Sequence, residues 1–367
     1  MNKFMDKKTA RRQIGKLYLV DSVGSLMIAG ASWCALLAAR GFSTAAIGLA
    51  ESIFHVASMI FEVPSGAIAD VFGRKNTMIA SRVVSVLAAL MMIFSDSFFL
   101  IGIAMVVSAL SYNLASGTRE ALAYDSLKEA GIEDEYDKFA SNDLVIYQIT
   151  SSLATLLAGA AIALGYKNAY AVDAFVGLFA IGIAASLREA KTELCKEKSV
   201  KKRFKEVTRE SALFLKNNSK VRLIIFLNAV IGAVSILILF FLQARLPEMG
   251  IEKALLGPAL FVMGLGAAVG AKAVEYIKPS RYRNICIFSF ACVVFALAMA
   301  FSGNIILAVI GGFIGAFGDN FIEVRTDIML NNMIPSEQRA TLMSVNSFVF
   351  SVVMIVLSPI LGVLFTL

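Results

Sequence analysis

Apolar runs long enough to cross a bilayer recur along the whole chain, separated by short polar stretches. A spanning helix needs ~20 mostly apolar residues, and about eleven segments reach that length. The pattern therefore predicts an all-α membrane protein. The predicted spans cover roughly residues 17–39, 45–69, 76–95, 98–117, 143–165, 168–187, 221–245, 255–277, 284–302, 304–324 and 341–366.

Composition agrees with this pattern. The chain is 58% hydrophobic and 17% charged, whereas soluble domains are about 45–50% apolar and about 25% charged. Its four cysteines have no metal-ligand or disulfide spacing, and the sequence contains no nucleophile, metal or cofactor constellation. We therefore predict a protein that is not an enzyme and that uses no cofactor or metal.

The net charge of +7 could indicate a nucleic-acid partner, but the distribution of Lys and Arg favours a membrane explanation. With the amino terminus inside, only Arg40, Lys167, Arg245 and Lys253 fall on the outer side. Lys and Arg are enriched in cytoplasmic loops of membrane proteins. We predict a multi-pass protein of the plasma or inner membrane with a cytoplasmic amino terminus, in contact with lipid and not with nucleic acid.

Two halves are expected, with a basic stretch between them. Residues 1–187 hold six predicted spans, 188–220 form a cytoplasmic linker, and 221–367 hold five. Asn113 and Arg119 match Asp319 and Arg325 at one common offset, as expected for parallel repeats. This repeat predicts a twelfth span beyond Leu367, which is either naturally absent or lost from this sequence.

The loop after the second span carries the most specific motif, Gly66-Ala-Ile-Ala-Asp70-Val-Phe-Gly73-Arg74-Lys75. It resembles the signature loop of the major facilitator superfamily, although Val71 replaces a usual arginine. The resemblance implies the major facilitator fold, with Asp70, Gly73 and Arg74 in a cytoplasmic gate.

Further segments resemble a bacterial drug or metabolite efflux branch of the same superfamily. They are residues 61–66, 116–127 and 334–341. The intramembrane arginine that the family uses in the fourth span has no counterpart here, where Ser111, Tyr112 and Asn113 occupy the region.

One face of the second span carries polar side chains. Glu51, His55, Ser58 and Glu62 follow helical spacing, and His55 is the chain's only histidine. Ionisable groups within a membrane face a water-filled path or a buried partner. The stripe predicts proton coupling or substrate binding. Each residue also has a structural alternative. Glu62 would pair with Arg82 or Arg119, Glu51 would be solvated near the outer headgroups, and a neutral His55 would bond a hydroxyl.

The tenth span carries a second polar cluster. Asp319 and Glu323 are candidates for proton coupling or substrate binding, or for a helix–helix hydrogen bond. Arg325 with Asp327, and Arg119 with Asp125, are expected to complete the cytoplasmic gate. Candidate cavity-lining residues are Trp33, Tyr112, Asn113, Gln148, Asn228 and Gln243.

These observations favour a monomeric secondary transporter that works by alternating access. The expected activity is proton-coupled efflux of a small amphipathic compound, with protons as the coupling ion. Two alternatives stay open: a facilitator or uptake symporter for a polar metabolite, and a membrane sensor or scaffold without turnover.

Overall fold

The computed structural model describes residues 5–190, 209, 213, 216, 218–278, 281–333 and 339–366. This part of the chain contains helices and no strand, as predicted. Most of the predicted linker at 188–220 lies outside the described residues. The elements are α1 (Lys7–Ser25), α2 (Ile28–Ala31), α3 (Trp33–Ala39), α4 (Thr44–Phe72), α5 (Arg74–Ile93), α6 (Phe98–Ala115), α7 (Thr118–Glu129), a 3-10 turn (Glu133–Glu135), α8 (Tyr136–Leu156), α9 (Ala158–Leu164), α10 (Tyr166–Ala185), α12 (Ser219–Glu248), α13 (Lys253–Tyr276), α14 (Tyr282–Ala300), α15 (Ile305–Met333) and α16 (Arg339–Thr366).

Among the described residues, 9 helices are long and apolar enough to span a membrane, or 10 if α8 and α9, bent by 47°, form one span. The prediction of an all-α membrane protein is confirmed. The count falls below eleven mainly because the first predicted span is interrupted between α1 and α3. Asp173 of α10 explains the first break, since its carboxylate accepts the N–H groups of Ala29 (3.3 Å) and Gly30 (2.9 Å), which a continuous helix would use internally.

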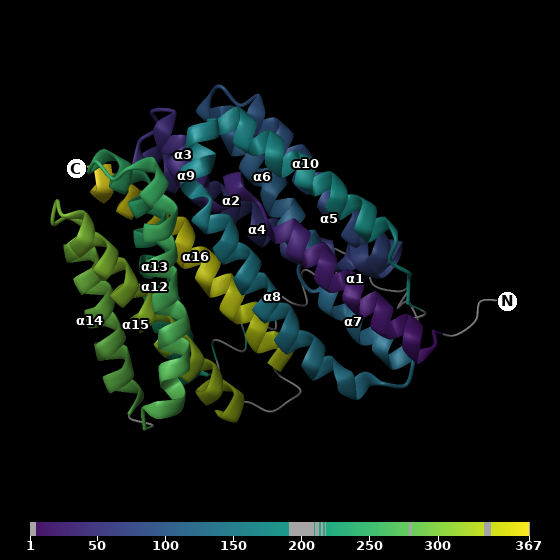
Figure 1. Cartoon of the computed structure of the whole chain (residues 1–367). Coiled ribbons are helices and arrows are strands. Elements are labelled where there is room, and N and C mark those ends of the chain that lie inside the picture. Colours follow the sequence, from purple (N-terminus) through teal and green to yellow (C-terminus); the bar gives the residue numbers. More distant parts are fainter. Residues whose placement is uncertain are drawn as a thin grey trace. The chain divides into compact units, whose positions relative to one another are not determined.

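The chain divides into two compact units, and Figure 1 labels the helices that belong to them. Unit 1 comprises Met1–Ala31, Ala57–Leu157 and Leu164–Phe204. Within it, α10 packs against α5 and α1, and α5 packs against α6. Tyr18 stacks on Phe139 at a centroid distance of 5.4 Å, beside the buried side chains of Leu17 and Leu122.

Unit 2 comprises Ser32–Val56, Ala158–Ala163 and Lys205–Leu367. Within it, α15 packs against both α13 and α14, and α12 packs against α15 and α16. Helix α4 supplies its first part to unit 2 and the rest to unit 1.

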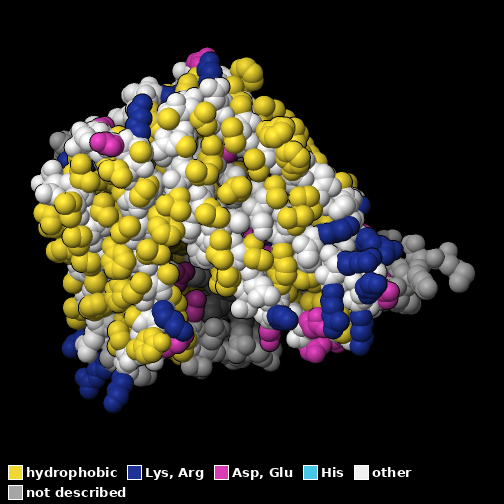
Figure 2. Space-filling view, in the orientation of Figure 1, with side chains coloured by type: hydrophobic (Ala, Val, Ile, Leu, Met, Phe, Trp, Pro, Cys, Tyr) yellow, Lys and Arg dark blue, Asp and Glu magenta, His cyan; other side chains and the backbone are white. Residues whose placement is uncertain are grey.

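The surface of unit 2 has apolar side chains along its helices and charged side chains at their ends. On the face drawn in Figure 2, hydrophobic side chains cover α13 and α14, and Lys and Arg gather at the lower end of these helices. The exposed residues there include Lys278, Arg281 and Arg283. An apolar band with charged ends suits helices that sit in hydrocarbon with their termini in water.

Candidate functional site

Glu51 and His55 of α4 form the core of the candidate site, both of them only 8% exposed. They lie one helical turn apart, and His55 Nε2 is 3.3 Å from Glu51 Oε1. His55 Nδ1 is 3.3 Å from the hydroxyl of Ser351 on α16. A single imidazole thus joins a carboxylate on its own helix to a hydroxyl on another, and we call these three residues the His55 chain.

Aromatic rings surround the imidazole. Phe54 and Phe350 both meet it edge to face, at centroid distances of 5.5 and 5.8 Å. Electrostatic interactions strengthen where apolar groups exclude water. In this environment the energy of the His55–Glu51 pair therefore depends strongly on its protonation state.

Small and polar residues let α4 and α16 approach closely within unit 2. The Ser52 hydroxyl donates to the carbonyl of Ile355 at 2.9 Å, and the Thr44 hydroxyl donates to that of Gly362 at 2.8 Å. Gly48 lies against the backbone carbonyl of Ser358, where a Cβ would collide. This α4–α16 contact, from Thr44 to His55, ends at the His55 chain.

The other half of the predicted stripe belongs to unit 1. The Asn113 side chain of α6 donates to the Ser58 hydroxyl at 2.8 Å. Glu62 is half-buried, and among the described residues it forms no ion pair. The alternative pairing of Glu62 with Arg119 is wrong, because Arg119 contacts other carboxylates.

Arg119 is the centre of a buried ion network in unit 1. It pairs with Asp21 of α1, and its guanidinium lies 2.9 Å from both Glu120 and Asp143. Arg82, also buried, lies against Gly24 of α1. Both arginines thus contact α1, and the expected pair of Arg119 with Asp125 is wrong.

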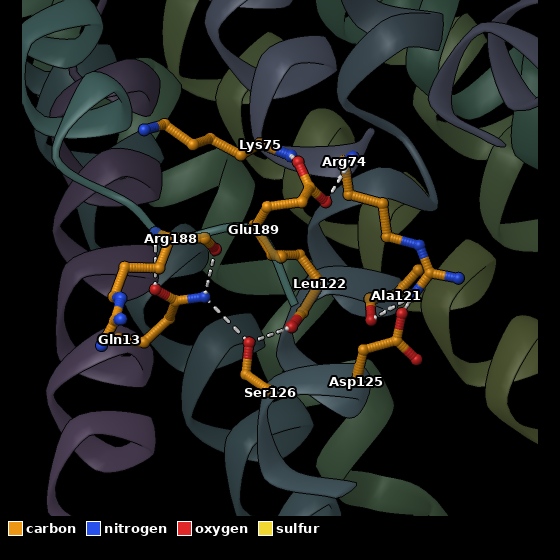
Figure 3. A network of polar contacts seen from close by, with 9 residues as sticks. All are labelled: Gln13, Arg74, Lys75, Ala121, Leu122, Asp125, Ser126, Arg188 and Glu189. Carbon is orange, nitrogen blue, oxygen red and sulfur yellow. Dashed lines mark hydrogen bonds and ion pairs between the residues drawn. The ribbon is translucent and has the colours of Figure 1, made fainter. Parts of the chain in front are cut away.

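Asp125 pairs instead with Arg74, in the contacts drawn in Figure 3. The Arg74 guanidinium also donates to the carbonyl of Ala121 at 2.6 Å. Two residues of the predicted gate, Arg74 and Asp125, are therefore brought together, while half-buried Asp70 lies at the end of α4.

Glu189 caps the start of α5 in the same region (Figure 3). Its carboxylate accepts the backbone N–H groups of Arg74 (2.8 Å) and Lys75 (3.0 Å), and a carboxylate at a helix N-terminus complements the helix dipole. Gly73 precedes the helix at a φ of 88°, and a Cβ there would meet the Glu189 carboxylate at 2.5 Å. Only glycine therefore fits both the backbone and the cap.

The chain after α10 is fastened to unit 1 by a second residue, Gln13 of α1. Its side chain exchanges two hydrogen bonds with the backbone of Arg188, both 2.8 Å, and donates to the Ser126 hydroxyl at 2.9 Å. The first residues of the predicted linker are thus held on α1 and α5.

The cluster on α15 lies in unit 2. Asp319 is buried, and its Oδ1 lies 3.1 Å from where a Cβ would stand on Gly232 of α12. Glu323 and Asp327 are exposed. Arg325 donates to the carbonyls of Val274 (3.1 Å) and Ile277, and no ion pair joins it to Asp327 within the described residues.

The candidate cavity-lining residues have varied surroundings. Trp33 meets Phe240 edge to face at 5.8 Å. Tyr112 and Gln148 are exposed, whereas Gln243 is buried and Asn228 is half-buried. That these residues and Asn113 line a cavity stays a prediction.

Comparison with known proteins decides the family. The sequence model of the Major Facilitator Superfamily matches residues 17–359. The chain belongs to the Major Facilitator Superfamily. It is therefore a multi-pass membrane transporter, not an enzyme, and it carries out secondary transport by alternating access.

Relatives within the superfamily agree on the fold. The chain is 31% identical over 126 residues to "Uncharacterized MFS-type transporter YxaM" of Bacillus subtilis (strain 168), a match that covers 34% of this chain and 31% of that protein. The solved nucleoside transporter NupG superposes with a TM-score of 0.72 at 13% identity, covering 96% of this chain and 91% of that one. A D-xylose-proton symporter gives a TM-score of 0.71 at 11% identity, covering 95% and 90%.

Sequence reasoning missed several residues of the contacts described above, among them Asp143, Asp173, Glu189 and Ser351. Asp143 and Asp173 are carboxylates in otherwise apolar predicted spans, and that position alone was a signal. Glu189 and Ser351 carried no such signal, because a charge at the start of a basic linker and a serine in an apolar span are both common.

Proposed function

We propose that this transporter exports a small amphipathic compound in exchange for protons, and that the His55 chain is a coupling site. The observation that carries the proposal is the placement of His55 between Glu51 and Ser351. A proton that binds there is shared by a contact between two helices, so its binding can be linked to their separation.

The neutral and protonated forms of His55 differ in the free-energy cost of burying the His55–Glu51 pair. In a neutral imidazole with Nε2 protonated, the N–H donates to Glu51 and Nδ1 accepts from the Ser351 hydroxyl; in the imidazolium both nitrogens donate. With Glu51 ionised, the neutral imidazole leaves one net negative charge, and the imidazolium makes the pair neutral overall. Burying an unbalanced charge costs more than burying a hydrogen-bonded pair, so protonation favours the closed α4–α16 contact.

The proposed topology gives this closure a direction. We infer that the amino terminus lies in the cytoplasm and that the halves 1–187 and 221–367 rock about a central site. The first residues of α4 then lie at the outer face. A proton taken up from outside closes that face, and opening to the cytoplasm releases the proton there.

Selection of the cargo is assigned to the acidic face of α15. Asp319 and Glu323 would attract a cationic or polar group, and Glu62 of α4 is a separate candidate in unit 1. Trp33 and Tyr112 are candidates for the apolar part of the compound.

The gate at the cytoplasmic ends is proposed to combine two sets of residues. Asp70, Gly73, Arg74 and Asp125 form one set, and the Arg119 network forms the second. Arg325 and Asp327 are their proposed counterparts in the second repeat.

Transport in proteoliposomes tests the proposal, with ethidium as a cationic amphipathic probe. With an acidic lumen, exchange predicts that ethidium accumulates inside while protons leave, and that Glu51→Gln and His55→Gln remove the dependence on the pH gradient. Glu248→Gln, which removes an exposed carboxylate of α12, is the matched control. Ethidium exchange that ignores the pH gradient in the unaltered protein would refute proton coupling.

Proton-coupled uptake is the second candidate, favoured by the likeness to a D-xylose-proton symporter. It predicts the opposite sign: accumulation requires an alkaline lumen, because solute and proton then move inward together. The same proteoliposomes loaded at the two pH values separate the candidates.

A further inference from the structure

A groove between α12 and α16 in unit 2 is not part of the proposed transport site. Its volume is about 550 Å³, within the range of about 300–1,000 Å³ that is typical of ligand pockets. It is lined by Ser219, Arg222, Leu223, Phe226, Phe348, Val349, Val352 and Val353.

The groove opens away from the His55 chain. Phe350 and Ser351 of α16 contact His55, and at about 100° per residue the groove-lining positions of α16 are centred on the opposite side of that helix. Leu223 and Phe226 are exposed apolar side chains of α12, 57% and 49% accessible. The groove therefore lies on a different face of α16 from the His55 chain, beside exposed apolar side chains of α12.

One end of the groove is polar and basic, and the rest is apolar. Arg222 and Ser219 lie at the start of α12, and Lys220 lies beside them. The start of α14 meets α12 there through Tyr282, whose hydroxyl donates to the carbonyl of Ile224 at 3.5 Å, which brings Arg281 and Arg283 to the same end. Among the described residues that line the groove, Arg222 is the charged one and the others are Ser219 and apolar side chains.

We propose that this groove binds an anionic phospholipid. The phosphate lies at Arg222 and Ser219, and one acyl chain lies along Phe226, Phe348 and Val352. A positively charged mouth above an apolar groove complements a molecule that joins a phosphate to a hydrocarbon chain, and basic pockets between helices at the cytoplasmic side bind such headgroups.

Native mass spectrometry of the detergent-purified full chain tests the site, with phosphatidylglycerol and phosphatidylcholine of the same acyl chains as probes. We expect phosphatidylglycerol to bind more tightly, and Arg222→Gln to weaken it about fivefold, the effect of one basic residue near an anionic headgroup. Val352→Trp fills the groove and should weaken both lipids. Arg283→Gln removes a charge from the same end but outside the lining, and should bind like the unaltered protein.

Three outcomes would overturn the proposal. Equal losses of phosphatidylglycerol affinity in Arg222→Gln and Arg283→Gln would mean that binding depends only on the overall charge of that end. Undiminished binding in Val352→Trp would place the acyl chain elsewhere. Complete displacement of phosphatidylglycerol by inorganic phosphate would mean an anion site with no acyl component. Melting temperatures that match the unaltered protein establish that each variant is folded.

Discussion

The buried carboxylates in the described part of this protein are of two kinds: some form an ion pair and others do not. Asp21 and Asp143 are matched by Arg119, whereas Asp319 has no ion-pair partner among the described residues. A buried carboxylate that is held by a fixed cation contributes to the stability of the fold around it. A carboxylate without a fixed cation can respond to a proton or to cargo, which supports the assignment of Asp319 to transport.

Replacement of Arg119 tests the stabilising role. Arg119→Gln leaves two buried carboxylates without their cation, and breaking a buried pair costs about 3–5 kcal/mol of unfolding free energy. The apparent melting temperature in detergent should therefore fall well below that of the unaltered protein. Arg11→Gln is the control, because the side chain of Arg11 is 62% exposed in its pair with Glu135, and it should leave the melting temperature unchanged. Equal effects of the two changes would contradict the buried network.

Among the elements, α4 and α16 depend on close backbone approach. Sequence patterns predicted both helices as spans, because length and hydropathy are local properties. The contact itself could not be predicted, since it depends on Gly48 meeting the carbonyl of Ser358, which is distant in the sequence. The interruption of the first span was equally hidden, because it requires Asp173 of α10 to take the N–H groups of Ala29 and Gly30.

Replacement of a glycine tests how much the close approach of α4 and α16 contributes to stability. Gly48→Ala places a methyl group against the Ser358 carbonyl, and such overpacking costs about 1–3 kcal/mol. Gly264 of α13 has open space where a Cβ would stand, so Gly264→Ala is the matched control and should be neutral or stabilising by up to about 1 kcal/mol. Thermal unfolding in detergent should separate the two variants, and a neutral Gly48→Ala would show that the helices do not need this approach.

At the scale of the whole molecule, the sequence was most informative about family. The motif from Gly66 to Lys75 carries it, and the match over residues 17–359 confirms it. The candidate site was predicted only in part: Glu51 and His55 are joined as their spacing on one helix suggested, but Ser351 and the partners of Arg74 and Arg119 come from distant segments. Helical periodicity specifies which side chains share a face and leaves open what that face meets.

The central claim is that protonation of the His55 chain controls the α4–α16 contact, and a distance measurement tests it most directly. Spin labels at Leu49 and Ile360, which are 46% and 56% exposed, report the separation of the two helices once the four native cysteines are replaced. The pair in which the imidazole is protonated is the one that tolerates burial.

Pulsed electron paramagnetic resonance on the labelled protein should therefore show the short distance gaining population as the pH of the sample is lowered. Glu51→Gln and His55→Gln should each flatten this response, whereas Glu248→Gln should preserve it. An unchanged pH response in both Glu51→Gln and His55→Gln would contradict the account.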